Sequence, residues 1–376
     1  MEQRRSAAGG YARGNIVTRS SADVVVVGGG AIGASTAWHL RELGIDDVVL
    51  VERDTLASGS TSKSAGGIRT QFADELNVRI ALRSLEELRR FADEIDLRQH
   101  GYLFLLDDDA DMAAFREAVA LQNRLGVPSR VLTPSEAAEL VPQLVVDDLV
   151  GATTCDWDGY ATPEALVQAY ARGLDVRQGW PAERVVVANG RVEAVEGPRG
   201  RIATGCVVCC AGVWTPELAA TAGVEIPVEG EARWMWFSPQ DGGLPERLPL
   251  TIDFSTGFYL HREGGGIVFG GREPALEEVA AHAEKRVPAI VEAPVQSSWW
   301  GYYELSPDHN AIVGEAAGPT RLLYATGFSG HGFQQAPAVG EHLAELVAGR
   351  EPTLDLGAFS LDRFARGEQR REIFVV

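Results

Sequence analysis

The 376-residue sequence predicts an α/β fold in which a mostly parallel sheet is interrupted by a second, mostly antiparallel sheet. Short apolar runs followed by glycine turns occur near Val24, Cys206 and Leu322, as expected of parallel strands buried on both faces. Aromatic-rich strands instead dominate the stretch from Pro227 to Gly271. The chain thus leaves the first sheet and returns to it, which predicts a discontinuous first domain and an inserted second domain.

The strongest local signal is a strand that ends in a glycine-rich turn. Val24–Val27 is a β-branched run, and Gly28, Gly30 and Gly33 follow it with the spacing G-x-G-x-x-G. Gly28 permits a tight turn, Gly30 lets the backbone approach a pyrophosphate, and Gly33 lets the next helix pack against the strand. The spacing is typical of a dinucleotide-binding turn, with a purely structural turn as the alternative.

The elements after this turn complete a βαβ unit. An amphipathic run predicts a helix over 31–43, and Val48–Val51 form a second strand. The helix N-terminus would face the phosphates, and Glu52 at the tip of the second strand would accept hydrogen bonds from an adenosine ribose. The sequence therefore predicts a bound dinucleotide, with a flavin dinucleotide and NAD as the two alternatives.

A serine-, threonine- and glycine-rich loop over 57–67 follows the βαβ unit. Its hydroxyls and backbone amides suit an anionic ligand, although a solvated linker is the other interpretation. Beyond it we expect helices over 73–95, 110–125, 134–140 and 162–173, a strand over 100–106, and short strands near Val185 and Val192.

The second half of the chain departs from this pattern and then rejoins it. A strand over 206–210 ends at Ala211-Gly212, which repeats an apolar parallel strand followed by a glycine turn. Strands over 311–314 and 322–327 and a helix reaching about residue 348 return to the first domain. Between them, the aromatic strands predict the apolar walls of a small-molecule pocket around Trp234–Phe237, Phe254, Phe258–Arg262 and Ile267–Gly270.

Composition and charge limit the class of protein. Hydrophobic residues make up 45% of the chain, and the formal net charge of −19 opposes binding to nucleic acid or anionic lipid. No apolar run approaches the roughly 18 residues of a membrane-spanning helix. Residues 1–20 have no apolar signal-peptide core, so we expect a flexible tail and a cytoplasmic protein without a membrane anchor.

The four cysteines predict buried thiols. Cys206, Cys209 and Cys210 crowd one apolar strand, and Cys155 lies far away in the sequence. Cys206 and Cys209 have C-x-x-C spacing, but no second cysteine or histidine pair completes a metal site. We therefore expect a reducing environment and no metal.

Five motifs in order resemble the flavin-dependent D-amino acid oxidase superfamily, and within it the glycine oxidase and sarcosine oxidase branch. They occupy residues 23–52, 59–69, 211–214, 306–308 and 327–333. The resemblance implies a Rossmann-like FAD-binding domain and an α+β substrate domain with a large, mostly antiparallel sheet. We expect the FAD-binding domain over 21–100, 157–225 and 305–376, and the substrate domain over 101–156 and 226–304.

The resemblance also implies where FAD binds. The adenosine half would lie on the first βαβ unit and the flavin ring between the two domains. A helix starting near Gly332 would direct its positive end at the pyrimidine edge of the flavin. The implied FAD-binding residues are Gly28, Gly30, Ala31, Ile32, Gly33, Glu52, Arg53, Ser60, Thr61, Ser64, Ala65, Gly66, Gly67, Val185, Ala211, Gly212, Trp214, Gly327, Gly330, His331, Gly332, Phe333 and Gln334.

Four residues are implied for catalysis and substrate binding. Arg69 matches the carboxylate-binding arginine of the branch, and its planar fork suits a carboxylate; a surface ion pair is the alternative. Tyr303 falls where sarcosine oxidases place an active-site tyrosine, and Tyr259 falls near the carboxylate-binding tyrosine of glycine oxidases. Either could be a core aromatic, and His331, beside the flavin, could be a structural histidine.

Four positions depart from the pattern of covalent or sarcosine-specific relatives. Gly301 stands where monomeric sarcosine oxidases have the cysteine bonded to FAD, and Lys63 stands where other covalent relatives have Cys or His. We therefore expect non-covalent FAD. Gln334 and Val268 replace, respectively, a carboxylate-contacting lysine and a lysine that promotes reaction with oxygen, so neither sarcosine as substrate nor a fast oxidase reaction is implied.

The expected reaction is oxidation of the C–N bond of a glycine-type amino acid, most simply an N-substituted glycine. A hydride would pass from Cα to flavin N5 while Arg69 holds the carboxylate, and no catalytic base is assigned. The imine would hydrolyse to an amine and glyoxylate, and O2 would reoxidise the flavin to give H2O2. Two alternatives are a proline- or dimethylglycine-type dehydrogenase with a protein acceptor, and a flavoprotein that keeps FAD only as a structural element.

The aromatic residues of the inserted domain predict a bulky apolar N-substituent on the substrate. Each buried CH2 of such a group would contribute about 0.8 kcal/mol. The alternative is that these aromatics only fill the core and that glycine or sarcosine is the substrate. The residues concerned are Trp234, Trp236, Phe254, Phe258 and Tyr302.

Overall fold

The computed structural model describes residues 20–375 and confirms the α/β architecture. The flexible tail expected over residues 1–20 falls almost wholly outside the described residues. One sheet has six strands: β1 (Val24–Val27), β2 (Val48–Val51), β8 (Asp175–Arg177), β12 (Val207–Cys209), β18 (Ile312–Glu315) and β19 (Leu322–Thr326). Their order is β18-β19-β12-β1-β2-β8, and all neighbours run parallel except β18 and β19.

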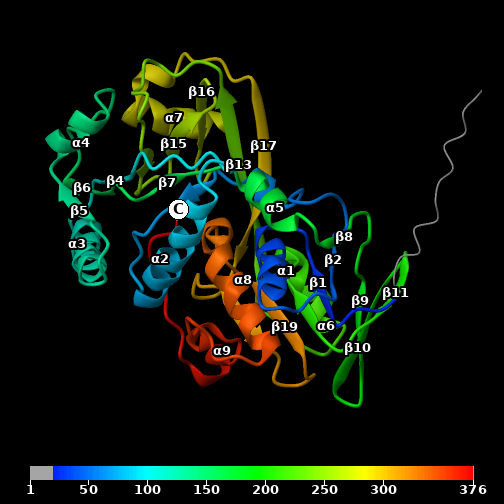
Figure 1. The fold of residues 1–376 in the computed structure, drawn as a ribbon. Helices are drawn as coiled ribbons and strands as arrows, with labels where there is room; N and C mark the ends of the chain where they lie inside the picture. Colours follow the sequence, from blue (N-terminus) through cyan, green and yellow to red (C-terminus); the bar gives the residue numbers. More distant parts are fainter. Residues whose placement is uncertain (1–19, 376) are drawn as a thin grey trace, which may run out of the picture.

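Both faces of this sheet are buried, because alternate side chains of its central strands enter different cores. Val24 and Val26 pack under helices, whereas Val25 and Val27 pack on the opposite face. The helices are α1 (Ala31–Glu42), α2 (Glu75–Arg90), α5 (Pro163–Ala171) and α8 (Gly332–Ala348), with α1 beside α8 in Figure 1. The opposite face is covered by α6 (Thr215–Ala220) and a three-stranded sheet, β9 (Arg184–Ala188), β10 (Arg191–Gly197) and β11 (Gly200–Ala203).

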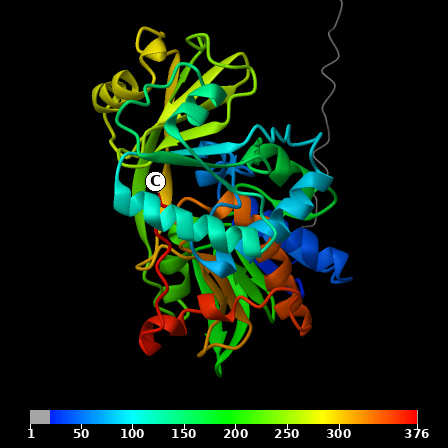
Figure 2. The same ribbon diagram turned by 90° about the vertical axis from the view of Figure 1, so that its left-hand side faces the viewer.

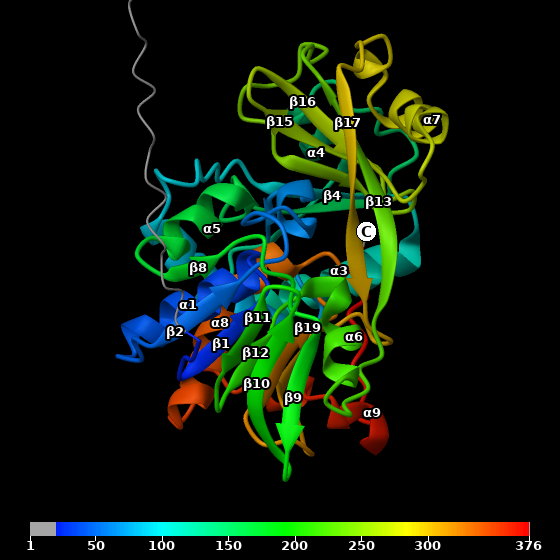
Figure 3. The same cartoon turned by 90° about the vertical axis from the view of Figure 1, so that its right-hand side faces the viewer.

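A second sheet has eight strands: β4 (Tyr102–Leu106), β5 (Arg130–Leu132), β6 (Gly151–Cys155), β13 (Glu229–Ser238), β14 (Leu250–Asp253), β15 (Tyr259–Glu263), β16 (Gly266–Gly270) and β17 (Ser297–Leu305). Their order is β17-β13-β16-β15-β14-β4-β6-β5, and only β4 and β14 pair in parallel. Figure 3 shows β13 and β17 as long paired strands that reach down to the six-stranded sheet.

Helices cover both faces of the eight-stranded sheet. The helix α3 (Asp109–Arg124), which crosses the middle of Figure 2, packs on one face, and α4 (Pro134–Leu140) and α7 (Leu276–Arg286) pack on the other. Besides short 3-10 helices, the described residues form the strand pair β3 (Gly67–Ile68) and β7 (Gly159–Tyr160) and the short helix α9 (Asp362–Arg366).

Most elements expected from the sequence are present within a few residues of their predicted bounds. The helix over 73–95 ends at Arg90, because turns that reach a positive φ at Asp96 replace its last part. Phe254 lies just beyond β14, in a turn that Asp253 caps through Thr256. Elements that were not predicted include β5, β6, β8, β17 and α7, several of which are short or partly exposed and so give a weak periodic signal.

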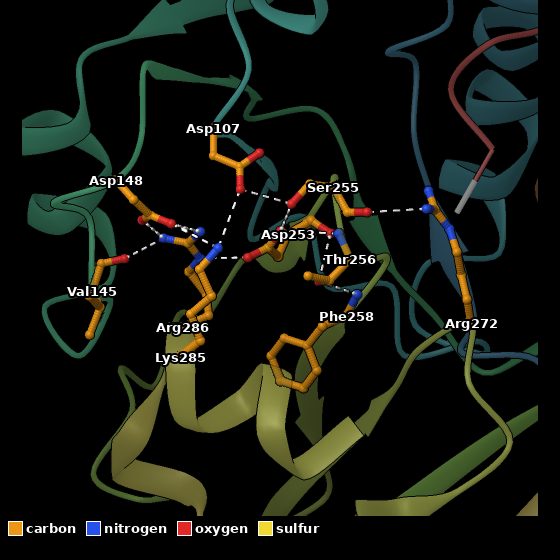
Figure 4. Close-up of polar contacts among 10 residues, drawn as sticks. All are labelled: Asp107, Val145, Asp148, Asp253, Ser255, Thr256, Phe258, Arg272, Lys285 and Arg286. Carbon is orange, nitrogen blue, oxygen red and sulfur yellow. Dashed lines mark hydrogen bonds and ion pairs between the residues drawn. The ribbon is translucent and has the colours of Figure 1, made fainter. Parts of the chain in front are cut away.

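A buried ion pair joins α7 to the turn between β14 and β15, as Figure 4 shows. Arg286, only 1% exposed, donates from Nε to Asp253 Oδ2 at 2.6 Å and from Nη1 to Asp148 Oδ1 at 2.8 Å. Asp253 also accepts a hydrogen bond from the Ser255 hydroxyl at 3.0 Å. This network fixes the turn that leads into Tyr259.

The segment over 370–375 runs back against α2 and the eight-stranded sheet. Glu372 is fully buried and accepts hydrogen bonds from the amides of Ala73 and Asp74. The ring of Phe374 stacks on Phe115 with centroids 3.8 Å apart. This part of the chain therefore closes one side of the interior rather than extending into solvent.

The cysteines, the helices and the metal-ligating side chains of the described residues bear on the class of protein. All four cysteines are free and buried, as predicted. Among residues 20–375 no helix is long and apolar enough to cross a membrane. No cluster of metal-ligating side chains occurs in the same range.

Candidate active site

A cavity of about 750 Å³ extends from the carboxyl ends of β1, β2 and β12 to one face of the eight-stranded sheet. Parallel strands of this kind commonly bind their ligands at that edge. Most of the predicted site residues line the cavity. They are Gly28, Gly30, Ala31, Ile32, Glu52, Arg53, Ser60, Thr61, Ser64, Ala65, Gly67, Arg69, Ala211, Gly212, Trp214, Tyr259, Tyr303, Gly330, His331, Gly332, Phe333 and Gln334.

Four predicted FAD-binding residues lie outside the cavity wall. A Cβ on Gly33 would lie 1.9 Å from the Gly28 carbonyl oxygen, and one on Gly66 would lie 2.0 Å from the Ala161 oxygen. Gly327 has a φ of +72° in a tight turn. Val185 is fully buried in the core beneath the six-stranded sheet. The three glycines thus shape the backbone around the site, and the Val185 side chain packs in the core.

The end of the cavity beside β1 has the form of a phosphate-binding turn. Gly28 has a φ of +110°, and a Cβ there would lie 2.3 Å from the Cys210 oxygen, so only glycine fits. Helix α1 begins after Gly30, which supplies no side-chain cap, and Ala31 and Ile32 of its first turn line the cavity. Glu52 accepts a hydrogen bond from the Gly29 amide at 2.7 Å and so lies beside the turn.

The predicted serine- and threonine-rich loop lines the cavity beside this turn. Its residues Ser60–Lys63 form a short 3-10 helix. The Thr61 hydroxyl accepts a hydrogen bond from the Ala31 amide at 3.1 Å, and the Ser60 hydroxyl donates to the Tyr302 carbonyl at 2.9 Å. The loop therefore links the two sheets across the cavity, which excludes the solvated-linker interpretation.

The N-terminus of α8 enters the cavity from a different side. This helix begins after His331 without a side-chain cap, and Gly332, Phe333 and Gln334 of its first turn line the cavity. Burial, reinforced by the nearby Arg69 charge, holds the pKa of His331 well below its usual range. The histidine is thus neutral, and it can accept a hydrogen bond.

Arg69 is a buried cavity residue and not a surface residue. It is 3% exposed, and its Nη2 lies 2.8 Å from His331 Nε2. Its Nη1 donates to the Gln71 oxygen and its Nη2 to the Phe374 oxygen, each at 2.5 Å. Burial lowers the pKa of Arg69 from its usual value, although an arginine stays charged at neutral pH. The surface ion-pair interpretation is therefore wrong.

Three tyrosines surround the space beside Arg69. Tyr102, Tyr259 and Tyr303 all line the cavity, and burial raises the pKa of each above its usual value. None of their hydroxyls has a hydrogen-bond partner among residues 20–375. The cavity therefore holds neutral hydroxyl groups that are free to donate to a ligand.

Several residues of the cavity wall were not among the predicted site residues, and three of them carry polar side chains that bear on the chemistry: Tyr102, Arg233 and Glu304. Arg233 lies on β13 close to Trp234 and Trp236, from which an apolar pocket wall was predicted. Tyr102 opens β4 in the predicted substrate domain, and Glu304 follows Tyr303 on β17. No local motif marks any of them, because each reaches the cavity only through sheet pairing.

Glu304 is a carboxylic acid with an unusual environment. It accepts a hydrogen bond from the Thr326 hydroxyl at 2.8 Å, and burial raises its pKa from 4.5 to about 7. Because the pKa of Glu304 is higher in the folded protein than its ordinary value of 4.5, protonated Glu304 contributes to the free energy of unfolding. This contribution is fully present below pH 4.5 and is lost as the pH rises through about 7.

We therefore predict that the wild-type protein loses stability relative to Glu304→Gln when the pH is raised from 5 to 8.5. The loss should be about 1 to 3 kcal/mol in the free energy of unfolding, because the glutamine does not ionise. Urea unfolding of both proteins at several pH values measures it. Parallel pH profiles of the two proteins would show that Glu304 does not titrate in this range.

Comparison with known proteins identifies the family. A family model described as FAD dependent oxidoreductase matches residues 23–346. The chain belongs to this family. FAD is therefore the dinucleotide, rather than NAD, and the protein is a FAD-dependent oxidoreductase.

Several relatives are similar over nearly the whole chain. FAD-dependent oxidoreductase domain-containing protein 1 of Bos taurus is 31% identical and covers 93% of this chain and 86% of its own length. Mitochondrial sarcosine dehydrogenase of Mus musculus is 29% identical over 92% of this chain, which spans only 42% of that longer protein. The crystal structure of L-proline dehydrogenase from P. horikoshii is 33% identical, with a TM-score of 0.88 over 94% of this chain and all of that one.

The cavity fits FAD on its own geometry. The N-termini of α1 and α8 both line it, and they suit the pyrophosphate and an electron-rich ring edge respectively. The cradle at Gly28 excludes any side chain. When bound, FAD supplies a two-electron acceptor for the oxidation of a C–N bond.

We predict that FAD binds without a covalent bond. Gly301 packs against Lys63, and a Cβ at position 301 would lie 2.5 Å from the Lys63 Cβ, so this wall offers no thiol and no room for one. Acid precipitation should release yellow FAD into the supernatant. Flavin that remained in the protein pellet would contradict the prediction.

Proposed function

We propose that the protein oxidises an N-substituted glycine, a secondary amino acid, to an imine that hydrolyses to an amine and glyoxylate. The observation that carries this proposal is a buried, charged Arg69 beside three neutral tyrosine hydroxyls, in the same cavity as the FAD-binding turn. A carboxylate beside a reacting C–N bond requires this combination of a cation and hydrogen-bond donors.

Arg69 is proposed to hold the substrate carboxylate. Its Nε has no hydrogen-bond partner among residues 20–375, whereas the Gln71 and Phe374 oxygens fix the rest of the guanidinium. The neutral His331 also holds Arg69 in place, which makes it a positioning residue. The side-chain oxygen of Gln334 accepts the Arg69 backbone amide at 2.7 Å and completes this support.

No side chain beside Arg69 is assigned as a base. The tyrosines are neutral and the histidine is deprotonated, so the substrate amine is proposed to enter in its neutral form. The enclosing walls would exclude water while the carboxylate is held, and positioning then provides the larger part of the rate enhancement.

The electron acceptor distinguishes two versions of this function. We propose O2, with H2O2 as product, and retain a dehydrogenase of the proline type as the second candidate, because the L-proline dehydrogenase structure is 33% identical. Hydrogen peroxide formed under air at the rate of substrate oxidation supports the oxidase. Turnover that requires an added artificial acceptor supports the dehydrogenase.

The free, buried cysteines support a proposed cytoplasmic location.

The apolar N-substituent expected from the sequence has lost most of its support. Of the five aromatic residues behind it, only Tyr302 lines the cavity. Trp236 and Phe258 are core residues on the face covered by α7, Trp234 packs against that core, and Phe254 packs near Phe115.

Anaerobic bleaching of the flavin tests the proposed function. Glycine, sarcosine, N-alkylglycines, proline and D-amino acids are mixed with the enzyme in the absence of oxygen, and the loss of flavin absorbance is followed. N-substituted glycines should bleach it fastest. Bleaching by proline alone would favour the second candidate, and no bleaching by any compound would refute the amino acid substrate.

A further inference from the structure

The wall of the cavity opposite the apolar core contains a second arginine that the proposed function does not use. Strand β13 alternates, so that Arg233 and Met235 line the cavity, whereas Trp234 and Trp236 stack on each other at the opposite face. Arg233 lies next to Gly301 on the paired strand β17. The Lys63 side chain packs against Gly301 on that strand, and both residues line the cavity with Arg233.

The hydrogen bonds of Arg233 are incomplete. Its Nη1 forms an ion pair with Glu231, but Nε is buried without a partner, and Nη2 has none among residues 20–375. The Nε and Nη2 edge is the one that binds a carboxylate in bidentate fashion. By contrast, Nη2 of Arg69 already contacts His331 and the Phe374 oxygen. Among the described arginines that line this cavity, Arg233 is therefore the one with both a buried, unpaired Nε and an unpaired Nη2, and Nη2 is the nitrogen left to donate to a ligand.

Arg233 belongs to the same ligand space as Arg69. Its guanidinium carbon lies 5.2 Å from the centre of the Tyr303 ring, and the charges of both arginines act on the Tyr303 hydroxyl. Tyr303 thus lies near both cations, and Tyr259 lies near Tyr303 and Arg233. An unpaired, largely desolvated guanidinium is unfavourable unless a ligand completes its hydrogen bonds.

We propose that Arg233 is a second anion-binding site in the substrate cavity and that the substrate carries a carboxylate on its N-substituent, as in an N-(carboxyalkyl)glycine. This inference rests on the proposed function, in which Arg69 holds the glycine carboxylate. One carboxylate lies at Arg69 and the other at Arg233, with the amine between them beside Tyr303. The sequence-based expectation of an apolar substituent is replaced by a charged one.

Binding of compounds that cannot be oxidised tests the site without turnover. Glutarate and adipate are titrated into the FAD-bound enzyme and compared with their monoamides, with the change in the flavin absorption spectrum as readout. Each dicarboxylate should bind at least about tenfold more tightly than its monoamide. In Arg233→Met this ratio should fall to about one, and Arg233→Lys should retain part of it.

Arg272→Met is the matched control. Arg272 is an exposed arginine whose charge acts on Arg233, but it lies outside the cavity wall and donates to the Ser255 and Phe254 carbonyls. This variant should keep the wild-type preference for dicarboxylate over monoamide, because it removes only the distant Arg272 charge and leaves Arg233 in place. A ratio of about one in the wild type, or one that persists in Arg233→Met, overturns the inference. Equal weakening of diacid and monoamide by Arg233→Met also overturns it, because Arg233 would then bind the carboxylate that both share.

Anaerobic flavin bleaching with N-(carboxyalkyl)glycines and their terminal amides separates this inference from the proposed function. The acids should bleach the flavin at least about tenfold more efficiently than the amides. If N-alkylglycines are oxidised but acids have no advantage, the second site is wrong and the proposed function stands. If no glycine derivative is oxidised but the preference for dicarboxylates is observed, the proposed function is wrong and the anion site stands.

Discussion

Replacing Arg69 by methionine should lower kcat/KM for the substrate by about a hundredfold or more, with FAD still bound. The guanidinium is 3% exposed and charged, so a carboxylate that it holds is desolvated, and loss of such a contact is worth several kcal/mol. FAD should remain, because its proposed contacts lie at the Gly28 turn and the two helix N-termini. Steady-state kinetics and the flavin-to-protein absorbance ratio measure the two quantities.

Arg69→Lys serves as the matched control for this result. It retains the positive charge but loses the planar fork, and should recover only part of the lost efficiency. A flavin-free Arg69→Met protein that is still folded would assign Arg69 to the cofactor site. Unchanged kinetics in both variants would show that the arginine only holds the Phe374 carbonyl and the segment over 370–375 in place.

Replacing Arg286 by methionine should reduce the free energy of unfolding by about 3 to 5 kcal/mol. Asp253 is 2% exposed and loses its 2.6 Å ion pair, which leaves a buried carboxylate without its counter-charge. The expected loss is large because Asp253 also organises the turn before Tyr259. Urea unfolding of the FAD-bound protein, followed by circular dichroism, measures it.

Lys285→Met is the control for the Arg286 variant. Lys285 precedes Arg286 on α7 and also pairs with Asp148, at 2.9 Å, but it is 47% exposed. Loss of an exposed ion pair should change the free energy of unfolding by less than about 1 kcal/mol. Equal effects of the two substitutions would show that the buried Asp253 contact contributes nothing beyond surface charge.

The nucleotide-binding half of the site could be predicted from the sequence because its determinants are local. Gly28, Gly30 and Glu52 belong to one contiguous βαβ unit, whose spacing follows from the turn and the helix that it must form. The loop with Thr61 and the start of α8 were found through motifs that are equally compact. The backbone conformation of each such motif depends mainly on its own residues, so the motif can be identified without knowledge of the tertiary structure.

The substrate half was predicted less well, because period-two patterns do not say which face of a strand meets a cavity. Arg233, Trp234, Met235 and Trp236 alternate, and the tryptophans were interpreted as the pocket wall. The structure places them under α7, where the space between helix and sheet accommodates large rings. The cavity face is left to Arg233 and Met235.

The sequence by itself determined the α/β fold, the dinucleotide turn and the presence of Arg69, since each depends on residues close together in the chain. Only the tertiary structure decided what surrounds Arg69. Tyr102, Arg233 and Tyr303 come from three strands whose order and register are fixed by sheet pairing, and Phe374 comes from a segment that follows the family motifs. Contacts between segments that are hundreds of residues apart depend on that packing, and no local pattern records them.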